Sequence, residues 1–312
     1  MRIACSSETF VELASVRHLF ETEVQDLNSF RFFRQIKNFD LLFTTWPTEQ
    51  KTFWLRTTLA FYRTKKLVIF VNLQEAAYQL SSADKKLLFR ASRIICPNLE
   101  SVRHGSLSPI YWKAPEKFRE IPFGVDLKKY SPRESFFPSQ NPVVAKFKAM
   151  INLVTKKVIK KGIPNILISC HDQADWQDIF ETDRIKGRIL YFDGSEGDQI
   201  TRVKAYQEAD IFVVPKNEGP ETIQQIIEAL ACGLVIVAPR SARLNNVFNH
   251  DQEGLFFKSG DNHDLIERIA ILCHDEEKRE KMARAARKLA ETHYDKKQRE
   301  EKVLQIIKEL EK

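Results

Sequence analysis

Residues 205–239, AYQEADIFVVPKNEGPETIQQIIEALACGLVIVAP, predict a β-α-β unit and with it a parallel sheet. Residues 211–214 form a short apolar run that ends at Pro215, as expected of a strand buried on both faces. Residues 234–238 form a second run of the same kind. Two buried strands separated by a helix-length segment are typical of α/β folds.

The segment between the two runs has the period of an amphipathic helix. Thr222 is followed by Gln225 at capping-box spacing, so we expect the helix to begin at Thr222. Gly233 supplies the stop at its carboxyl end. One apolar stripe with helical spacing faces the sheet: Ile223, Ile226, Ile227 and Leu230.

A polar loop, KNEGPE at 216–221, joins the first strand to this helix. It lies at the carboxyl end of a parallel strand, which is the edge where open α/β sheets bind their ligands. Free backbone N–H groups at a helix N-terminus favour phosphate. The loop therefore predicts a site for a phosphorylated ligand.

The first half of the chain shows the same alternation. Apolar runs at 41–46, 66–71 and 93–96 predict strands, and helical stretches at about 49–63 and 82–91 lie between them. Strands that alternate with helices, without hairpin signals, indicate a second parallel, Rossmann-like sheet.

Three segments resemble the nucleotide-sugar site of retaining, family-4-type glycosyltransferases of the GT-B fold. They are ADIFVVP, EG and IIEALACG within 209–233, EGLFFKSGDNHDLIERI at 253–269, and IPFGVDLKKYSP at 121–132. The matches together cover roughly residues 121–296, and they are specific as a set.

The resemblance implies an α/β fold of two Rossmann-like domains that face each other across a cleft, both somewhat trimmed in a chain of 312 residues. Residues 1–132 would form the acceptor-side domain and 133–295 the nucleotide-sugar-binding domain, and the Pro- and Ser-rich stretch 132–142 reads as the linker. In GT-B proteins a final helix often crosses back onto the first domain. Residues 296–312, which carry one apolar stripe, are the candidate for it.

The resemblance also gives roles to carboxylates. The family's two glutamates are spaced E-x7-E, the first near the donor sugar and the second at the ribose hydroxyls. Glu228 matches the second. Glu218 matches the first by its Glu-Gly pair but lies two residues too far upstream, which a loop insertion would reconcile, whereas Glu221 lies one residue too close. We expect Glu218 to be catalytic and Glu221 to bind the nucleotide sugar.

Basic and small residues complete the predicted site. Lys156 and Lys161 fall where the family has an Arg and a Lys that neutralise the donor diphosphate, and we expect them to be catalytic. The alternative is that both are surface lysines of a helix, which is the commoner case for such residues. Further nucleotide-sugar contacts are expected from the loop, from the helix start and from a loop that lies against the nucleobase in the family: Lys216, Gly219, Thr222 and Gly194.

Residues 143–168 have two interpretations. In one, 150–154 is the first strand of the second domain, and the two lysines follow it as in the family. In the other, an apolar stripe from Val144 to Val158 forms a helix that leads into a strand at 165–169. The second fits the family's element lengths better, and in it the first strand and its Arg are missing or displaced.

Charge and composition limit the partners and the compartment. The formal charge of +7 predicts an anionic partner, such as a nucleotide, an acidic glycan, nucleic acid or a lipid head group. Five scattered cysteines without a C-x-x-C pair indicate a reducing compartment. No apolar run approaches the roughly 20 residues of a membrane helix, so we expect a cytoplasmic protein, with the inner face of the cell membrane as an option. The histidines have no metal-site spacing, so we expect no metal or other cofactor.

Basic and aromatic residues interleave between residues 53 and 93. They form either a surface for an anionic membrane or acidic acceptor, or ordinary solvated helix faces with aromatic core positions. No RNP, zinc-finger or helix-turn-helix signature accompanies them, so nucleic acid is not an expected partner.

From these observations and the resemblance, we predict a glycosyltransferase. It would move a sugar from a nucleoside-diphosphate sugar to a glycan, a lipid-linked acceptor or a small molecule, with retention at the anomeric carbon and without a metal. Two alternatives stay open. One is a sugar-nucleotide or partner-binding module that has lost its catalytic cations, and the other is a GT-B-like sugar-nucleotide epimerase, which needs no acceptor.

Overall fold

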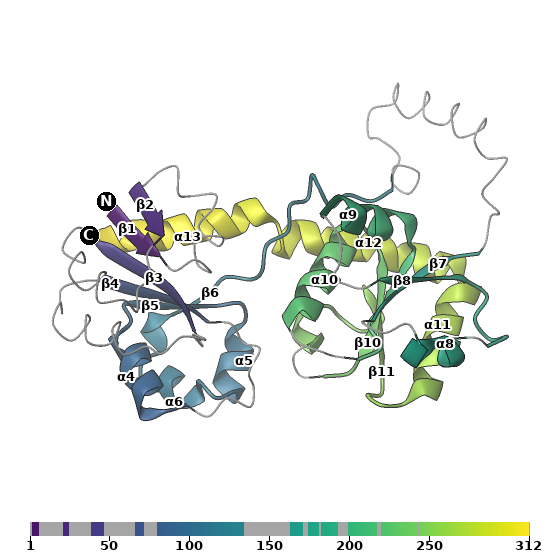
Figure 1. Cartoon of the computed structure of the whole chain (residues 1–312), viewed down its shortest axis with the longest axis horizontal. Coiled ribbons are helices and arrows are strands. Elements are labelled where there is room, and N and C mark those ends of the chain that lie inside the picture. Colours follow the sequence, from purple (N-terminus) through teal and green to yellow (C-terminus); the bar gives the residue numbers. More distant parts are fainter. Residues whose placement is uncertain are drawn as a thin grey trace, which may run out of the picture. The chain divides into compact units, whose positions relative to one another are not determined.

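The structure is a computed structural model in which the chain forms two compact units (Figure 1). Unit 1 comprises Met1–Phe123 and Lys297–Lys312, and unit 2 comprises Gly124–Lys296. The structure describes residues 2–5, 21–24, 39–46, 66–71, 80–133, 163–170, 174–180, 182–192, 199–216, 220–241 and 244–311.

Unit 1 contains a parallel sheet of six strands in the order β2-β1-β3-β4-β5-β6. The strands at 41–46, 66–71 and 93–96 are confirmed at the predicted bounds. The edge strands β2 and β6 were not predicted, because their sequences, ETEV and FRE, are mostly polar and give no apolar run. The strands are β1 (Arg2–Cys5), β2 (Glu21–Val24), β3 (Leu41–Trp46), β4 (Lys66–Val71), β5 (Arg93–Cys96) and β6 (Phe118–Glu120).

Three α-helices and a 3₁₀ turn follow β4 and β5 in unit 1. They are α4 (Ser82–Arg90), α5 (Leu99–His104), α6 (Ser108–Tyr111) and η3 (Pro115–Lys117). Ser81 caps α4 through a capping box with Asp84, and the Asn98 side chain accepts from the Ser101 N–H at 2.9 Å to cap α5. The predicted helix at 82–91 is thus confirmed, whereas the one at 49–63 lies outside the described residues.

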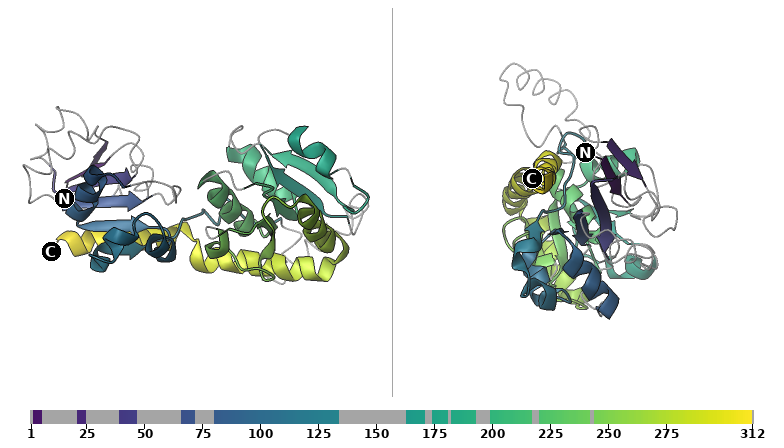
Figure 2. Two further views of the ribbon diagram at one scale, coloured as in Figure 1. Left: turned by 90° about the horizontal axis from the view of Figure 1, so that it is seen from below. Right: turned by 90° about the vertical axis from the view of Figure 1, so that its left-hand side faces the viewer.

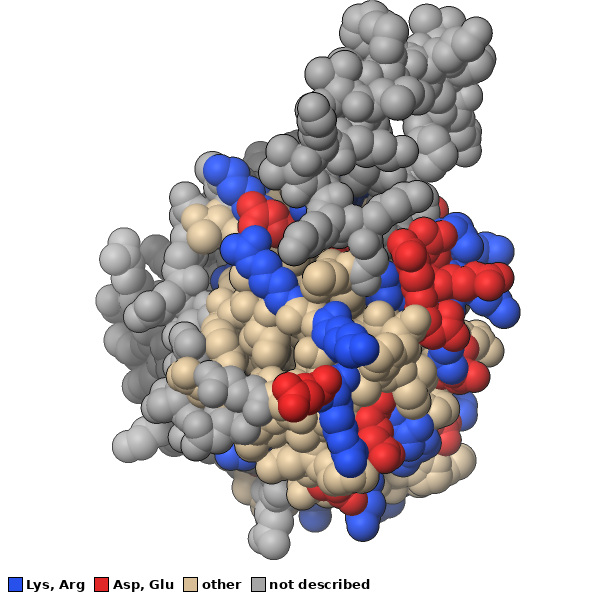
Figure 3. Space-filling view, turned by 90° about the vertical axis from the view of Figure 1, so that its right-hand side faces the viewer, with Lys and Arg blue, Asp and Glu red and all other residues tan. Residues whose placement is uncertain are grey.

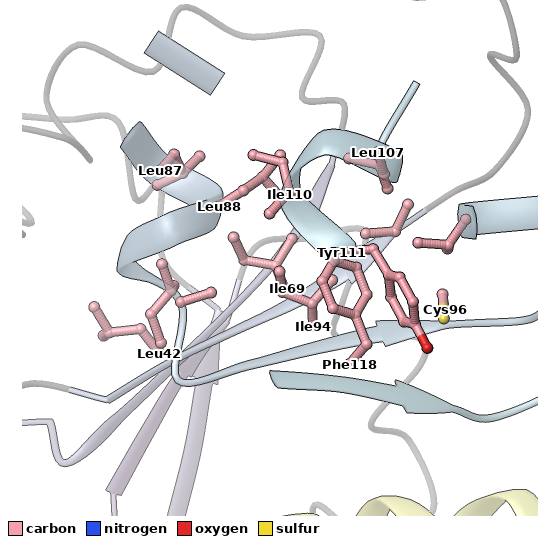
Figure 4. Packing of buried hydrophobic residues seen from close by; sticks show 14 of the residues in the cluster. Leu42, Ile69, Leu87, Leu88, Ile94, Cys96, Leu107, Ile110, Tyr111 and Phe118 are labelled. Carbon is pink, nitrogen blue, oxygen red and sulfur yellow. The ribbon is translucent and has the colours of Figure 1, made fainter. Parts of the chain in front are cut away.

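Both faces of this sheet are apolar, because alternate residues of each strand point to opposite sides. Leu42, Ile69 and Ile94 pack with α4 and α6 on one face (Figure 4). Their neighbours in sequence, such as Phe43 and Val68, belong to the cluster on the other face. A sheet that is covered on both sides explains why its strands read as continuous apolar runs.

The second face of the unit 1 sheet is covered by the last helix, α13 (Lys296–Glu311) (Figure 1, Figure 2). Its apolar stripe is buried against the strands: Val303, Ile306, Ile307 and Leu310. Polar contacts add to this packing. Lys66 Nζ donates to the Leu310 carbonyl, and the Glu309 carboxylate lies 3.7 Å from the guanidinium groups of both Arg93 and Arg119.

Unit 2 contains a parallel sheet of five strands in the order β11-β10-β9-β7-β8. Its strands are β7 (Asn165–Ser169), β8 (Arg188–Phe192), β9 (Ile211–Val213), β10 (Val235–Pro239) and β11 (Gly254–Phe257). Its helices are α8 (Ala174–Phe180), α9 (Gln199–Glu208), α10 (Pro220–Ala231), η4 (Leu244–Asn246), α11 (Asn262–His274) and α12 (Glu276–His293). The β-α-β unit expected at 205–239 is therefore present as β9, α10 and β10.

One part of the predicted threading of 143–168 falls within the described residues. The strand at 165–169 is confirmed as β7, which pairs with β8 and β9. The helical stripe and the alternative strand at 150–154 lie outside the described residues.

The cysteines are free thiols: Cys5, Cys96, Cys232 and Cys273 are buried and Cys170 is half-buried. Burial raises the pKa of Cys96 and of Cys232 to about 12, so these two thiols have the character of small core residues rather than of reactive groups.

Candidate functional site

The carboxyl edge of the unit 2 sheet is linked to the first turns of α10 by buried polar side chains. Ser169, the last residue of β7, donates through its hydroxyl to Gln225 Oε1 at 2.7 Å. Gln225 is 8% exposed and Thr222 is 7% exposed, although both are polar residues near the start of a helix. This hydrogen bond therefore fixes the first turns of α10 against the end of β7, at the edge where open α/β sheets bind ligands.

The start of α10 differs from the prediction. The helix begins at Pro220, so Thr222 and Gln225 lie inside it and Thr222 is not the capping residue. Proline is favoured at the first helical position, because its φ angle suits the helix and its missing N–H would have no partner there. This preference moves the helix start two residues upstream of Thr222.

Glu228 lies two turns into α10 and is buried, with 4% of its surface exposed. Gln224 Nε2 donates to its Oε1 at 3.2 Å, one helical turn earlier. Arg202 of α9 places its Nη1 3.9 Å from the other carboxylate oxygen, Oε2. Oε2 is buried and has no partner that meets strict hydrogen-bond geometry, but the hydroxyls of Tyr130 and Tyr206 lie close enough to lower the pKa of the carboxyl by hydrogen bonding.

The surroundings of Glu228 are aromatic as well as polar. Burial raises the pKa of its carboxyl, and Gln224, Tyr130, Arg202 and Tyr206 act in the opposite direction. Burial, and then the charge of Glu228, raise the pKa of Tyr206 well above the ordinary value, so its phenol stays protonated. The two tyrosine rings lie 6.3 Å apart between centroids.

Tyr130 reaches this cluster from the segment 124–133, which is bound to the helices of unit 2. Arg287 of α12 donates through Nη1 to the carbonyls of Tyr130 at 2.9 Å and of Ala231 at 2.6 Å. Gln207 Nε2 donates to the Ser131 carbonyl at 3.1 Å. These bonds hold the segment against α9, α10 and α12 and so fix the position of the Tyr130 ring.

The structure places Lys216 and Thr222 near the carboxyl edge of the sheet and Glu228 two turns further along α10. Lys216 is exposed just after β9, and Thr222 and Glu228 follow on α10. Glu221 also lies on α10, but its side chain is outside the described residues. The other predicted residues lie wholly outside them: Lys156, Lys161, Gly194, Glu218 and Gly219.

Sequence reasoning missed the side chains around Glu228. Arg202 and Tyr206 lie one turn apart on α9, and that spacing was a usable signal for a shared face. Tyr130 lies within the quoted segment 121–132, but nothing local to it indicates contact with α10. Ser169 and Gln225 are 56 positions apart, and only the folded sheet brings them together.

Two sequence comparisons place this region among sugar-transferring proteins. The family described as "Glycosyl transferase-like" matches residues 186–305, which include β9, α10 and Glu228. The chain is 34% identical over 112 residues to Sulfoquinovosyl transferase SQD2 from Arabidopsis thaliana. This match covers 34% of the present chain and 21% of the plant protein, so the two share about a fifth of the plant protein's length.

Solved structures resemble the whole chain. A glycosyltransferase from Rickettsia africae aligns with a TM-score of 0.66 at 14% identity, covering 99% of this chain and 90% of that one. Anabaena Alr3699/HepE, solved in complex with UDP, aligns with a TM-score of 0.64 at 13% identity and covers 99% of each chain. The chain has the GT-B fold of the glycosyltransferases. The GT-B fold predicted from the sequence is confirmed, and the family match over residues 186–305 supports the resemblance to glycosyltransferases.

The described residues contain neither a candidate membrane-spanning helix nor a candidate metal-binding cluster. None of the helices that the structure describes is both long and apolar enough to span a membrane. No group of three or more His, Cys, Asp or Glu side chains in the same residues could hold a metal ion.

Proposed function

We propose that this GT-B protein transfers a sugar from a nucleoside-diphosphate sugar to an acceptor hydroxyl. The observation that carries the proposal is the Glu228 carboxylate, which is buried at 4% exposure on α10 with one oxygen that has no partner at strict hydrogen-bond geometry. A buried carboxylate costs stability unless it is paired, and such groups cluster at functional sites. A ribose hydroxyl that donates to this carboxylate would displace part of its shell of Tyr130, Tyr206 and Arg202, because Oε2 is buried.

The rest of the sheet edge suits the diphosphate. The N-terminus of α10 carries about half a positive charge, and its first backbone N–H groups have no partner within the helix. Lys216 is exposed between the end of β9 and the start of α10. In the transfer, the bond between the anomeric carbon and the diphosphate oxygen breaks and a bond to the acceptor oxygen forms, while the proton of the acceptor hydroxyl passes to the departing diphosphate. Donors at the helix start would stabilise the negative charge that develops on the leaving diphosphate.

The relatives support this donor class. Anabaena Alr3699/HepE was solved with UDP, and its fold matches the whole chain. We further propose retention at the anomeric carbon and metal independence, with Glu218, Lys156 and Lys161 as the catalytic residues. The acceptor would be a glycan, a lipid-linked acceptor or a small molecule, and the protein would act in the cytoplasm. The proposals on mechanism and acceptor rest on the sequence resemblance, and the proposed compartment rests on the composition.

A thermal-shift panel of UDP-, GDP-, ADP- and CMP-sugars tests the donor. A ligand present at 100 times its Kd stabilises by about 2.7 kcal/mol, which is readily measured. We expect one base to give a clear shift and the other bases little. No shift with any donor would overturn the proposal.

Turnover assays with the best donor separate the three functions. Release of nucleoside diphosphate together with a glycosylated acceptor supports a transferase. Isomerisation of the donor sugar by the protein alone would replace the proposal with an epimerase. Donor binding without turnover on any acceptor would favour a binding module. The anomeric configuration of the product tests retention, and activity in EDTA tests metal independence.

A further inference from the structure

Two large hydrophobic side chains are exposed among the described residues of unit 1. Phe89 lies in the last turn of α4, and Trp112 directly follows α6. Phe89 is 38% exposed and Trp112 is 66% exposed. The apolar faces of the same two helices are turned toward the sheet, as Leu88 and Ile110 show (Figure 4). Phe89 and Trp112 therefore lie on the outer side of a layer whose core is already complete.

Contacts join the end of α4 to the turn after α6. Lys113 Nζ lies 6.0 Å from the centroid of the Phe89 ring. Lys117 Nζ donates to the Phe89 carbonyl at 2.5 Å. With the exposed lysines of α4, these residues form one surface, which we call the aromatic-basic patch: Lys85, Lys86, Phe89, Trp112, Lys113 and Lys117.

The segment that contains the patch carries most of the excess charge of the chain. Residues 81–119 include eight Lys and Arg but three Asp and Glu, a net of five positive charges out of the chain's seven. Of the three acids, Asp84 is used in the cap of α4 and Glu100 pairs with Arg103. Burial lowers the pKa of Lys117, and nearby Arg90 and Arg93 act in the same direction against Glu116, which shows how closely the cations are gathered.

Three of the four patch lysines form no ion pair within the part of unit 1 that the structure describes. No described carboxylate pairs with Lys85, Lys86 or Lys113. The face of unit 2 in Figure 3 differs, because acidic and basic residues are interspersed on it. Several of the unit 2 cations are paired along their own helices, such as Arg268 with Asp264 at 2.8 Å. The patch is thus a local feature of unit 1 rather than a property of the whole surface.

We propose that the aromatic-basic patch binds the surface of an anionic lipid bilayer. An indole suits the head-group layer, because its apolar body and N–H donor match the two sides of that layer. Lysine stems lie along apolar surface while their ammonium groups reach anionic head groups. Each such lysine contributes about 1 kcal/mol, or about fivefold in binding. This inference concerns unit 1 and does not depend on the proposed transferase activity.

Vesicle flotation of the full chain tests the proposal. The probes are vesicles of phosphatidylcholine alone and of phosphatidylcholine with 30% phosphatidylglycerol. We expect binding to the anionic vesicles only, and a loss of about 100-fold in the variant Lys85→Gln/Lys86→Gln/Lys113→Gln. The matched control, Lys186→Gln/Lys281→Gln/Lys288→Gln, removes the same charge from exposed positions of unit 2 and should change binding less than threefold.

A second measurement keeps the test specific. Trp112 fluorescence, isolated by comparison with Trp112→Phe, should be quenched by brominated lipids in the anionic vesicles. Equal losses in the two triple variants would overturn the proposal in favour of general charge attraction. Binding to soluble polyglutamate with no lipid quenching of Trp112 would assign the patch to an acidic macromolecule instead. No binding to anionic vesicles would also overturn it.

Discussion

The substitution Glu228→Gln distinguishes two effects of this buried carboxylate: its effect on the stability of the ligand-free protein and its effect on donor binding. The substitution keeps the shape of the side chain and an oxygen that can still accept from Gln224. It removes a buried negative charge whose cation, Arg202, keeps 28% of its side chain exposed and so retains contact with water. Because burial raises the pKa of Glu228, its charged form costs stability, and a neutral glutamine should stabilise by about 1 kcal/mol, the usual size of a single-substitution effect. The ligand-free variant should therefore melt about 2–4 °C higher, the shift that 1 kcal/mol gives in a unit of this size.

Ligand binding should change in the opposite direction. If Oε2 accepts from a ribose hydroxyl, the variant loses a hydrogen bond to a charged group, worth about 1.5–3 kcal/mol or roughly 10–100-fold in Kd. A donor at 100 times its wild-type Kd stabilises the wild type by about 2.7 kcal/mol. After a 100-fold loss of affinity, the same concentration stabilises by about 0.4 kcal/mol. Over the range of a 10- to 100-fold loss, the ligand-induced shift should fall from about 5–11 °C to about 1–6 °C.

Differential scanning fluorimetry with and without the best donor measures both quantities in one experiment. Glu267→Gln is the control, because Glu267 is a half-exposed residue on another helix of unit 2. Its melting temperature and its ligand shift should match those of the wild type. A Glu228→Gln variant that is stabilised but keeps its full ligand shift would falsify the reasoning, because Glu228 would then be a buried structural acid.

Two further predictions concern the stability of unit 2. Because the folded-state pKa of Glu228 is raised, the unfolded chain releases this proton first as pH rises from the ordinary carboxyl value of about 4.3. Wild type should therefore lose stability relative to Glu228→Gln across the window between 4.3 and the raised pKa, as measured by urea unfolding at several pH values; a constant difference would contradict this. Arg287→Met leaves the carbonyls of Tyr130 and Ala231 without their donor and should lower the unfolding free energy by about 2–4 kcal/mol. Arg284→Met, an exposed position on the same helix, should stay within about 0.5 kcal/mol, and equal effects would show that the bonds of Arg287 are unimportant.

The sequence alone predicted the parallel strands well. Residues 41–46, 66–71 and 93–96 have apolar side chains on both faces, and each strand is bounded by a change to polar residues. This signal is local, because a strand covered on both sides must be apolar throughout. The edge strands β2 and β6 lack this signal, because their sequences, ETEV and FRE, are mostly polar.

The candidate site was predictable only in part. Glu228 is conspicuous as an acid in an otherwise apolar helix segment, and the structure places it among buried groups. The start of α10 was misplaced, because Pro220 and Thr222 offer competing signals two residues apart and proline at the first position prevailed.

The sequence by itself determined the two α/β sheets and the helix that carries Glu228, because the periods of buried strands and helices can be read within a few residues. Only the tertiary structure decided that Tyr130, Arg202 and Tyr206 surround that carboxylate. It also decided which strands pack against the apolar stripe of α13, a helix that the resemblance had already assigned to the first domain. The physical reason is that these contacts join segments tens to hundreds of positions apart. Their closeness comes from packing around a shared core, which no local pattern records.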